Sequence, residues 1–134
     1  MSDFFTIRGY NRMEQGEISH TMEDYLEMIY RHVKNGKYIR VNQLASFLNV
    51  RPSSASKMAT KLRESGTVKF EPYGVIELTA KGEEIGAELL HRHNVLNSLF
   101  CLINNSDNEL ELVEKIEHSF NARTIKNIEL FLEK

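Results

Sequence analysis

The chain has 134 residues, of which 41% are hydrophobic and 27% are charged, a length that suits one compact domain or a small domain with an appendage. No apolar run approaches the roughly 20 residues that cross a bilayer, and the N-terminus lacks a signal-peptide pattern, so we expect a cytoplasmic protein without a membrane partner. The net charge of −2 argues against a general nucleic-acid coat protein, and the single cysteine excludes an intrachain disulfide and a zinc finger.

Six helices and one hairpin are predicted in chain order, after an irregular extension at residues 1–20. The helices follow the spacing of apolar residues and begin or end at capping residues such as Thr21, Asn42 and Gly66. Two β-rich runs at 68–70 and 75–79 flank a Pro- and Gly-containing turn, as in a β-hairpin. The expected helices cover approximately residues 21–35, 43–48, 53–65, 80–103, 109–120 and 123–132.

The order helix, short strand, helix, tight turn, helix and hairpin is that of a winged helix-turn-helix. We therefore predict a mostly α fold with a small β-ribbon. After the extension (1–20), the winged helix-turn-helix DNA-binding domain covers 21–80, and a helical dimerisation and metal-binding domain covers 81–134. The apolar positions of the long fourth helix favour a two-fold interface between subunits. They are Ile85, Leu89, Leu96 and Leu99.

Basic residues gather around the third helix, which is the expected recognition helix. Between Lys34 and Lys69 the single acidic residue is Glu64, whereas acidic residues crowd together past Gly82. Lys and Arg neutralise phosphates, and short hydroxyls let the helix approach base edges, although a charged run can also be a simple solvated face. The residues expected to contact double-stranded DNA are Arg40, Arg51, Pro52, Ser53, Ser54, Ser56, Lys57 and Lys61, with Tyr73 in the wing.

Carboxylates and histidines recur at helical spacing on three predicted helices. The first helix carries two acids three residues apart, the fourth carries a histidine, and the fifth carries an E-x-x-E-H run. Such a set repels itself unless a cation neutralises it. Its oxygen and nitrogen donors suit Mn²⁺, and Fe²⁺ or Zn²⁺ would also bind. The candidate ligands are Asp24, Glu27, His93, Glu114, Glu117 and His118. Spacing alone leaves open that each is an ordinary helix-terminal or solvated residue.

The segments TMEDYLEMIY, VRPSSASKMATKL, LTAKGEEIG, HRH and VEKIEHSF lie within residues 21–120. This stretch resembles the diphtheria-toxin-repressor (DtxR, iron-dependent repressor) family, and most closely its short manganese-responsive branch, the manganese transport regulators. The resemblance implies that the six candidate ligands bind two Mn²⁺ ions per subunit, without an organic cofactor. It also implies a homodimer that binds operator DNA and represses manganese-uptake genes. Iron-responsive members carry Met in place of Asp24 and Cys in place of Glu114, so these two acids favour manganese.

Two alternatives remain open. The chain could be a winged-helix regulator that responds to an organic ligand or to none. It could also be a dinuclear carboxylate enzyme, although those enzymes use four long helices, whereas here two predicted helices are short and a β-ribbon interrupts the chain. No nucleophile–base pair or phosphate-binding glycine loop is evident, so we expect no enzymatic activity.

Overall fold

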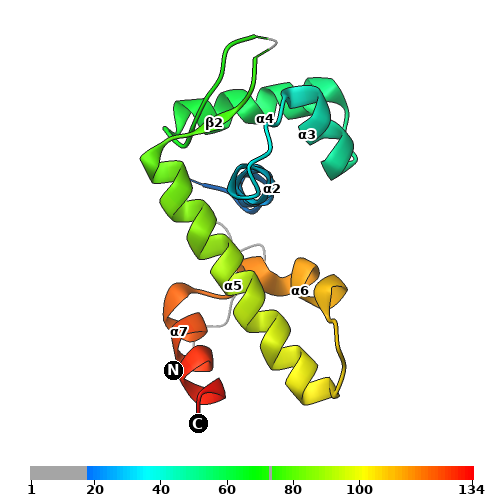
Figure 1. The fold of residues 1–134 in the computed structure, drawn as a ribbon, viewed down its shortest axis with the longest axis vertical. Coiled ribbons are helices and arrows are strands. Elements are labelled where there is room, and N and C mark those ends of the chain that lie inside the picture. The colour runs from blue at the N-terminus through cyan, green and yellow to red at the C-terminus, as the bar shows by residue number, and fades with distance from the viewer. Residues whose placement is uncertain (1–17, 73) are drawn as a thin grey trace, which may run out of the picture.

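The computed structural model describes residues 18–72 and 74–134, so Tyr73 and most of the predicted N-terminal extension lie outside the described residues. Helices α2, α3 and α4 and the hairpin form one end of the molecule, the head, and α5 runs from it to the end that contains α6, η1 and α7 (Figure 1). The mostly helical winged helix-turn-helix with one small β-ribbon confirms the predicted fold class. The elements are α2 (His20–Lys34), α3 (Val41–Leu48), α4 (Pro52–Glu64), β1 (Val68–Lys69), β2 (Glu77–Leu78), α5 (Ala80–Asn104), α6 (Leu110–Ile116), the 3₁₀ helix η1 (Glu117–Ser119) and α7 (Ala122–Leu132).

Two helices begin earlier than predicted. The N-cap of α2 is Ser19 rather than Thr21, because Ser19 has the extended backbone that a cap requires and its Oγ accepts the Met22 N–H at 3.2 Å. Helix α3 is preceded by Arg40 rather than capped by Asn42. Pro52, as predicted, is in the first turn of α4, where its missing N–H is harmless.

The wing is a short antiparallel hairpin of β1 and β2. Its strands are shorter than predicted, because only two residues of each keep the pairing. An isolated bridge between Arg40 and Val75 joins the wing to the segment before α3, and the Arg63 guanidinium lies 4.7 Å from the centre of the Phe70 ring. The wing is therefore attached both to the segment before α3 and to α4.

The larger core lies in the head, where Leu26, Ile29 and Leu62 are completely buried. Helix α5 approaches this core at two glycines. A Cβ on Gly82 would lie 2.0 Å from the Thr67 carbonyl oxygen, and one on Gly86 would lie 2.7 Å from the Tyr30 ring. The absence of side chains at these positions lets α5 lie directly against α2 and the segment that precedes β1.

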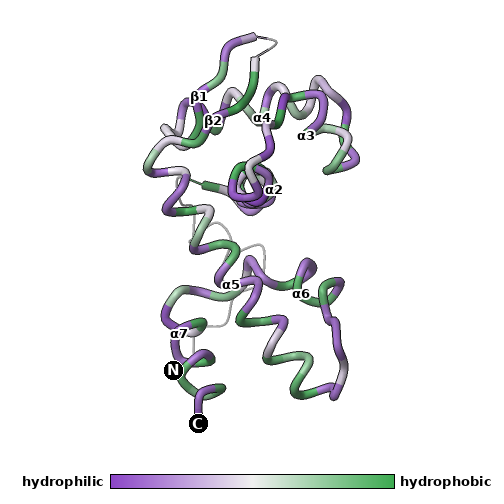
Figure 2. The backbone as a smooth tube through the Cα atoms, viewed as in Figure 1, coloured by the Kyte–Doolittle hydropathy of each residue, from purple (hydrophilic) through white to green (hydrophobic). Residues whose placement is uncertain are grey.

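A second, smaller core joins α5, α6 and α7 around Leu96 and Val113. Of the four predicted interface positions, Leu89 and Leu96 are 4% and 0% exposed, so the prediction was wrong for these two, whose side chains pack inside the protomer. Ile85 and Leu99 are half-buried. Hydrophilic and hydrophobic residues are mixed along every described α-helix (Figure 2). No described helix is both long and apolar enough to traverse a bilayer.

Candidate metal centre and DNA-binding face

The six candidate ligands come together at the junction of α2, α5, α6 and η1. Their donor atoms form two groups, and within each group all of these atoms lie within 4.8 Å of one another. Glu117 belongs to both groups and is completely buried. The first group consists of Glu27, His93, Glu114 and Glu117, and the second consists of Asp24, Glu117 and His118.

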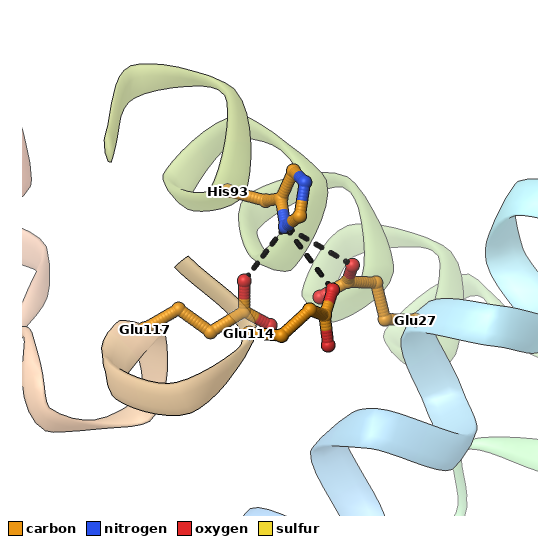
Figure 3. Close-up of side chains that lie close together, drawn as sticks. All are labelled: Glu27, His93, Glu114 and Glu117. Atoms are coloured by element: carbon orange, nitrogen blue, oxygen red, sulfur yellow. Dashed lines mark hydrogen bonds and ion pairs between the residues drawn. The ribbon is translucent and has the colours of Figure 1, made fainter. Parts of the chain in front are cut away.

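In the first group, the imidazole of His93 is surrounded by three carboxylates (Figure 3). Its Nδ1 donates to Glu117 Oε2 at 2.7 Å, and it lies 3.5 Å from Glu114 Oε1 and 3.8 Å from Glu27 Oε2. Glu27 and His93 are only 5% and 3% exposed, whereas the Glu114 side chain is 56% exposed. Residues from α2, α5, α6 and η1 thus converge on one buried site with one open side.

In the second group, His118 is held between two acidic side chains of α2. Its Nε2 donates to Asp24 Oδ1 at 2.5 Å, and its Nδ1 donates to Glu23 Oε1 at 2.8 Å. Burial alone would lower the pKa of His118, but these two hydrogen bonds and the negative charges of their acceptors outweigh it and raise the pKa to about 10. Arg92 Nη2 also lies 3.0 Å from His118 Nδ1 and 3.4 Å from Glu23 Oε1, so a second basic side chain stands beside these acids.

The first group holds more negative charge than its own residues neutralise. Burial and the adjacent charge of Glu117 raise the pKa of Glu27 to about 7 and also raise that of Glu114. Burial would raise the pKa of Glu117 as well, but the hydrogen bond from His93 helps to lower it. The buried Glu27 Oε1 and Glu117 Oε1 have no hydrogen-bond partner. Crowded carboxylates with unpaired oxygens are the arrangement that a divalent cation stabilises.

The backbone of the E-x-x-E-H run differs from the prediction. Instead of one helix over 109–120, α6 ends at Ile116 and η1 covers Glu117–Ser119. Phe120 has extended backbone and Asn121 caps α7, so the chain has to leave the α-helical path, and its last turn tightens into a 3₁₀ helix. Glu117 of η1 is buried beside His93, while Glu114 of α6 stays at the surface.

Three partners of these ligands, Arg92 among them, were missed by the sequence analysis. Glu23 binds His118, and the sequence offered no signal that distinguished it from its neighbour Asp24. Arg31 donates to Glu27 Oε2 from Nη2 at 2.7 Å and from Nε at 3.1 Å. The spacing of four residues between Glu27 and Arg31 could have revealed this pair, because such residues are neighbours on a helix.

Eight of the nine predicted DNA-contacting residues lie on the exposed side of the head, and the ninth, Tyr73, is outside the described residues. In α4 and the residue before it, Arg51, Ser53 and Lys57 are exposed, while Ala55, Ala59 and Leu62 face the core. A cleft of about 530 Å³ separates the start of α3, the start of α4 and the wing. The predicted residues with exposed side chains are Arg40, Arg51, Pro52, Ser53, Ser54, Ser56, Lys57 and Lys61, and three of them, Arg40, Pro52 and Ser56, line the cleft.

Known proteins similar to this chain are transcriptional regulators. The family described as "Iron dependent repressor, N-terminal DNA binding domain" matches residues 17–76. The HTH-type transcriptional regulator MntR of Shouchella clausii is 40% identical over 109 residues, which cover 81% of this chain and 76% of that protein. The regulator of the same name from Oceanobacillus iheyensis is 38% identical over 109 residues, which cover 81% of this chain and 74% of that protein.

The fold is also found among solved structures. That of the manganese regulator SloR matches with a TM-score of 0.73 at 24% identity, covering 84% of this chain and 53% of that chain. The present chain thus spans about half the length of that structure, and at this identity the match supports the fold alone.

Proposed function

Since the chain belongs to the iron-dependent repressor family and shares most of its length with MntR regulators, we propose that it is a manganese-responsive repressor that binds operator DNA as a homodimer. The observation that carries this proposal is the convergence of carboxylates and imidazoles from α2, α5, α6 and η1 beside a winged helix-turn-helix. Repression of manganese-uptake genes in the cytoplasm is the corresponding biological role.

The residues of the two groups fit divalent ions with a preference for oxygen donors. They offer four carboxylates and two imidazoles and no thiolate, a set that suits Mn²⁺ and that Fe²⁺ or Zn²⁺ could also occupy. Sharing of Glu117 between the groups supports two ions per subunit. We propose that no organic cofactor is needed. A bound ion would supply the positive charge that neutralises these crowded acids.

Helix α2 connects the candidate metal centre to the DNA-binding face. Asp24 and Glu27 point toward the ligands of α5 and η1, while Leu26 and Ile29 of the same helix belong to the core of the head. Fixing α2 against α5 therefore also fixes the orientation of α4. In a dimer this would set the separation of the two recognition helices, so that the metal-bound state is the one that fits the operator.

The surface between α5 and α7 is suited to dimer formation. A groove of about 400 Å³ is lined by Leu99, Ile128 and Phe131, and Phe131 is 66% exposed. We propose that the segment 81–134 provides both the dimer contacts and most of the metal ligands, whereas 21–80 binds DNA.

The proposal is tested by titrating metal-stripped protein with operator-type DNA at fixed salt, in the presence of Mn²⁺, Fe²⁺, Zn²⁺ or Mg²⁺. We expect Mn²⁺ to tighten DNA binding by roughly 5- to 150-fold, the usual range for coupling between two sites, and Mg²⁺ to have little effect. Equal binding with and without every metal would instead favour a metal-independent winged-helix regulator. The relatives are regulators rather than enzymes, which argues against the dinuclear carboxylate enzyme.

Replacement of Lys57 by Ala is expected to weaken operator binding at every sequence tested. Because Lys57 is exposed on α4, its loss would remove one phosphate contact and reduce the slope of log affinity against log salt by about one. Fluorescence anisotropy over a series of salt concentrations measures this slope. Lys126→Ala removes the same charge from the exposed side of α7 and is the control. An unchanged slope in Lys57→Ala would remove Lys57 from the DNA-binding face.

Manganese binding is expected to release protons. In the metal-free protein the pKa of His118 is raised to about 10, so His118 is protonated at both pH 6 and pH 8. The pKa of Glu27 is raised to about 7, so Glu27 is largely protonated at pH 6 only. These protons must leave before the groups can bind an ion, so affinity should fall as pH falls, by about tenfold per unit for each proton released. Calorimetric titration in two buffers of different protonation enthalpy counts the protons. Identical affinities at pH 6 and pH 8 would contradict this expectation.

A further inference from the structure

We propose that Arg31 is an internal cation that competes with the metal ion for the first group and thereby sets its affinity for metal. This inference rests on the proposed function and adds to it a residue that lowers the affinity of the site. Arg31 is not itself a ligand, because a guanidinium has no lone pair to donate and stays protonated in proteins.

The contact between Arg31 and Glu27 is directed at the oxygen that faces the site. Both guanidinium nitrogens, Nη2 at 2.7 Å and Nε at 3.1 Å, donate to Glu27 Oε2. That same oxygen is the one that lies 3.8 Å from His93 Nδ1. The guanidinium therefore neutralises Glu27 on the side where a metal ion would do so.

Arg31 can leave this position without disturbing the core. Its side chain is 37% exposed, whereas that of Glu27 is 7% exposed. A small cavity of about 210 Å³ lies beside the pair and is lined by Asp24, Glu27, Arg31 and Glu114. The cavity thus touches ligands of both groups, and Arg31 forms part of its wall. An ion that enters this way passes the guanidinium.

The positive charge of Arg31 opposes metal binding in either of two ways. If the side chain stays, a divalent ion in the first group is repelled by a cation a few ångströms away. If it swings into solvent, two charge-assisted hydrogen bonds are lost. Glu27 is therefore partly neutralised before any metal arrives.

Replacement of Arg31 by Met keeps much of the side-chain length and removes the charge. We expect Arg31→Met to bind Mn²⁺ about tenfold more tightly than the unmodified protein, an order of magnitude that follows from losing one unit charge close to the site. The increase in affinity should be similar for Mn²⁺ and Zn²⁺, because repulsion between charges does not distinguish ions of equal charge. Burial and Glu117 raise the pKa of Glu27 to about 7 and Arg31 opposes them, so dissociation constants are measured at pH 8, where fewer protons compete with the ion. The measurement is made without DNA, by competition with a fluorescent chelator.

Three further variants test whether the change in affinity comes from the charge of Arg31. Arg31→Lys retains the charge and should stay within about threefold of the unmodified protein. Arg31→Gln is a second neutral variant that should tighten binding as Arg31→Met does, and circular dichroism verifies that each variant is folded. Lys37→Met removes an exposed charge from the loop after α2 and should leave the affinity unchanged.

Unchanged or weaker binding in both neutral variants would overturn the inference and would mean that Arg31 supports Glu27 while metal is bound. If the unmodified protein and every variant failed to bind Mn²⁺, the proposed function itself would be overturned, and this inference with it. The two failures are therefore distinguishable.

Discussion

Replacing Glu117 by Gln is expected to abolish manganese activation of DNA binding, the largest functional effect of any single substitution in this chain. Glu117 is the one candidate ligand that both groups share, and its side chain is completely buried. Gln removes the negative charge and leaves only a neutral carbonyl oxygen as donor. We expect the affinity for Mn²⁺ to fall by at least about 100-fold, since even partners outside the ligand set can change metal affinity by 10- to 100-fold. Operator affinity in Mn²⁺ should then match that of metal-free protein.

The same substitution should leave the metal-free fold intact. The Gln carbonyl can still accept the hydrogen bond from His93, and the repulsion between Glu117 and Glu27 disappears. Chelator competition and DNA anisotropy with and without Mn²⁺ measure the two effects, and thermal unfolding of the metal-free variant tests the fold. Glu111→Gln, in the exposed part of α6, is the matched control. Retained activation in the Glu117 variant would show that neither group depends on this carboxylate.

Gly82→Ala is expected to destabilise the protein more than any other exchange of one small residue for another. A Cβ at this position would lie 2.0 Å from a backbone oxygen of Thr67, which cannot rotate away as a side chain can. Helix α5 would have to shift from the head, at a cost of about 3 kcal/mol, the upper part of the usual range for overpacking. For a chain of this size that corresponds to a melting temperature lower by about 10 °C.

The second glycine provides a graded comparison. At Gly86 the new methyl group would meet the Tyr30 side chain, which has more freedom to move, so Gly86→Ala should be the milder variant. Glu84→Ala, on the exposed side of α5, controls for the general preference of helices for Ala. Where space is available, Gly→Ala inside a helix stabilises by about 1 kcal/mol. A raised melting temperature in Gly82→Ala would therefore show that the contact with Thr67 is looser than described.

Much of this arrangement could be predicted from the sequence because it depends on local patterns. The apolar spacing of α2 and α4, Pro52 at the start of α4 and the turn residues of the wing each determine their own element. The six candidate ligands, which the family resemblance also implied, do come together, but their shared member Glu117 could not be identified from spacing. The difference in burial between Glu117 and Glu114 accompanies the change from α6 to the 3₁₀ helix, which the spacing of the run did not reveal.

The sequence-based predictions were wrong where tertiary packing determines which surface covers a residue or where a helix begins. The apolar row on α5 was assigned to a subunit interface, yet Leu89 and Leu96 are covered by the other helices of the same protomer. Periodicity identifies an apolar face but does not identify what covers it. The capping residues of α2 and α3 were wrong by two residues each, because several polar residues near each start were chemically able to cap.

Helix α2 faces two neighbours at once, which restricts how its sequence can evolve. Leu26 and Ile29 fill the core of the head, while Asp24 and Glu27 of the same turns face the candidate ligands. Inserting or deleting one residue would rotate the following part of the helix by about 100° relative to what precedes it. Core residues and ligands downstream of the change would lose their partners together. Substitutions can accumulate along α2 one position at a time, but a change in its length should be rare among functional descendants of this protein.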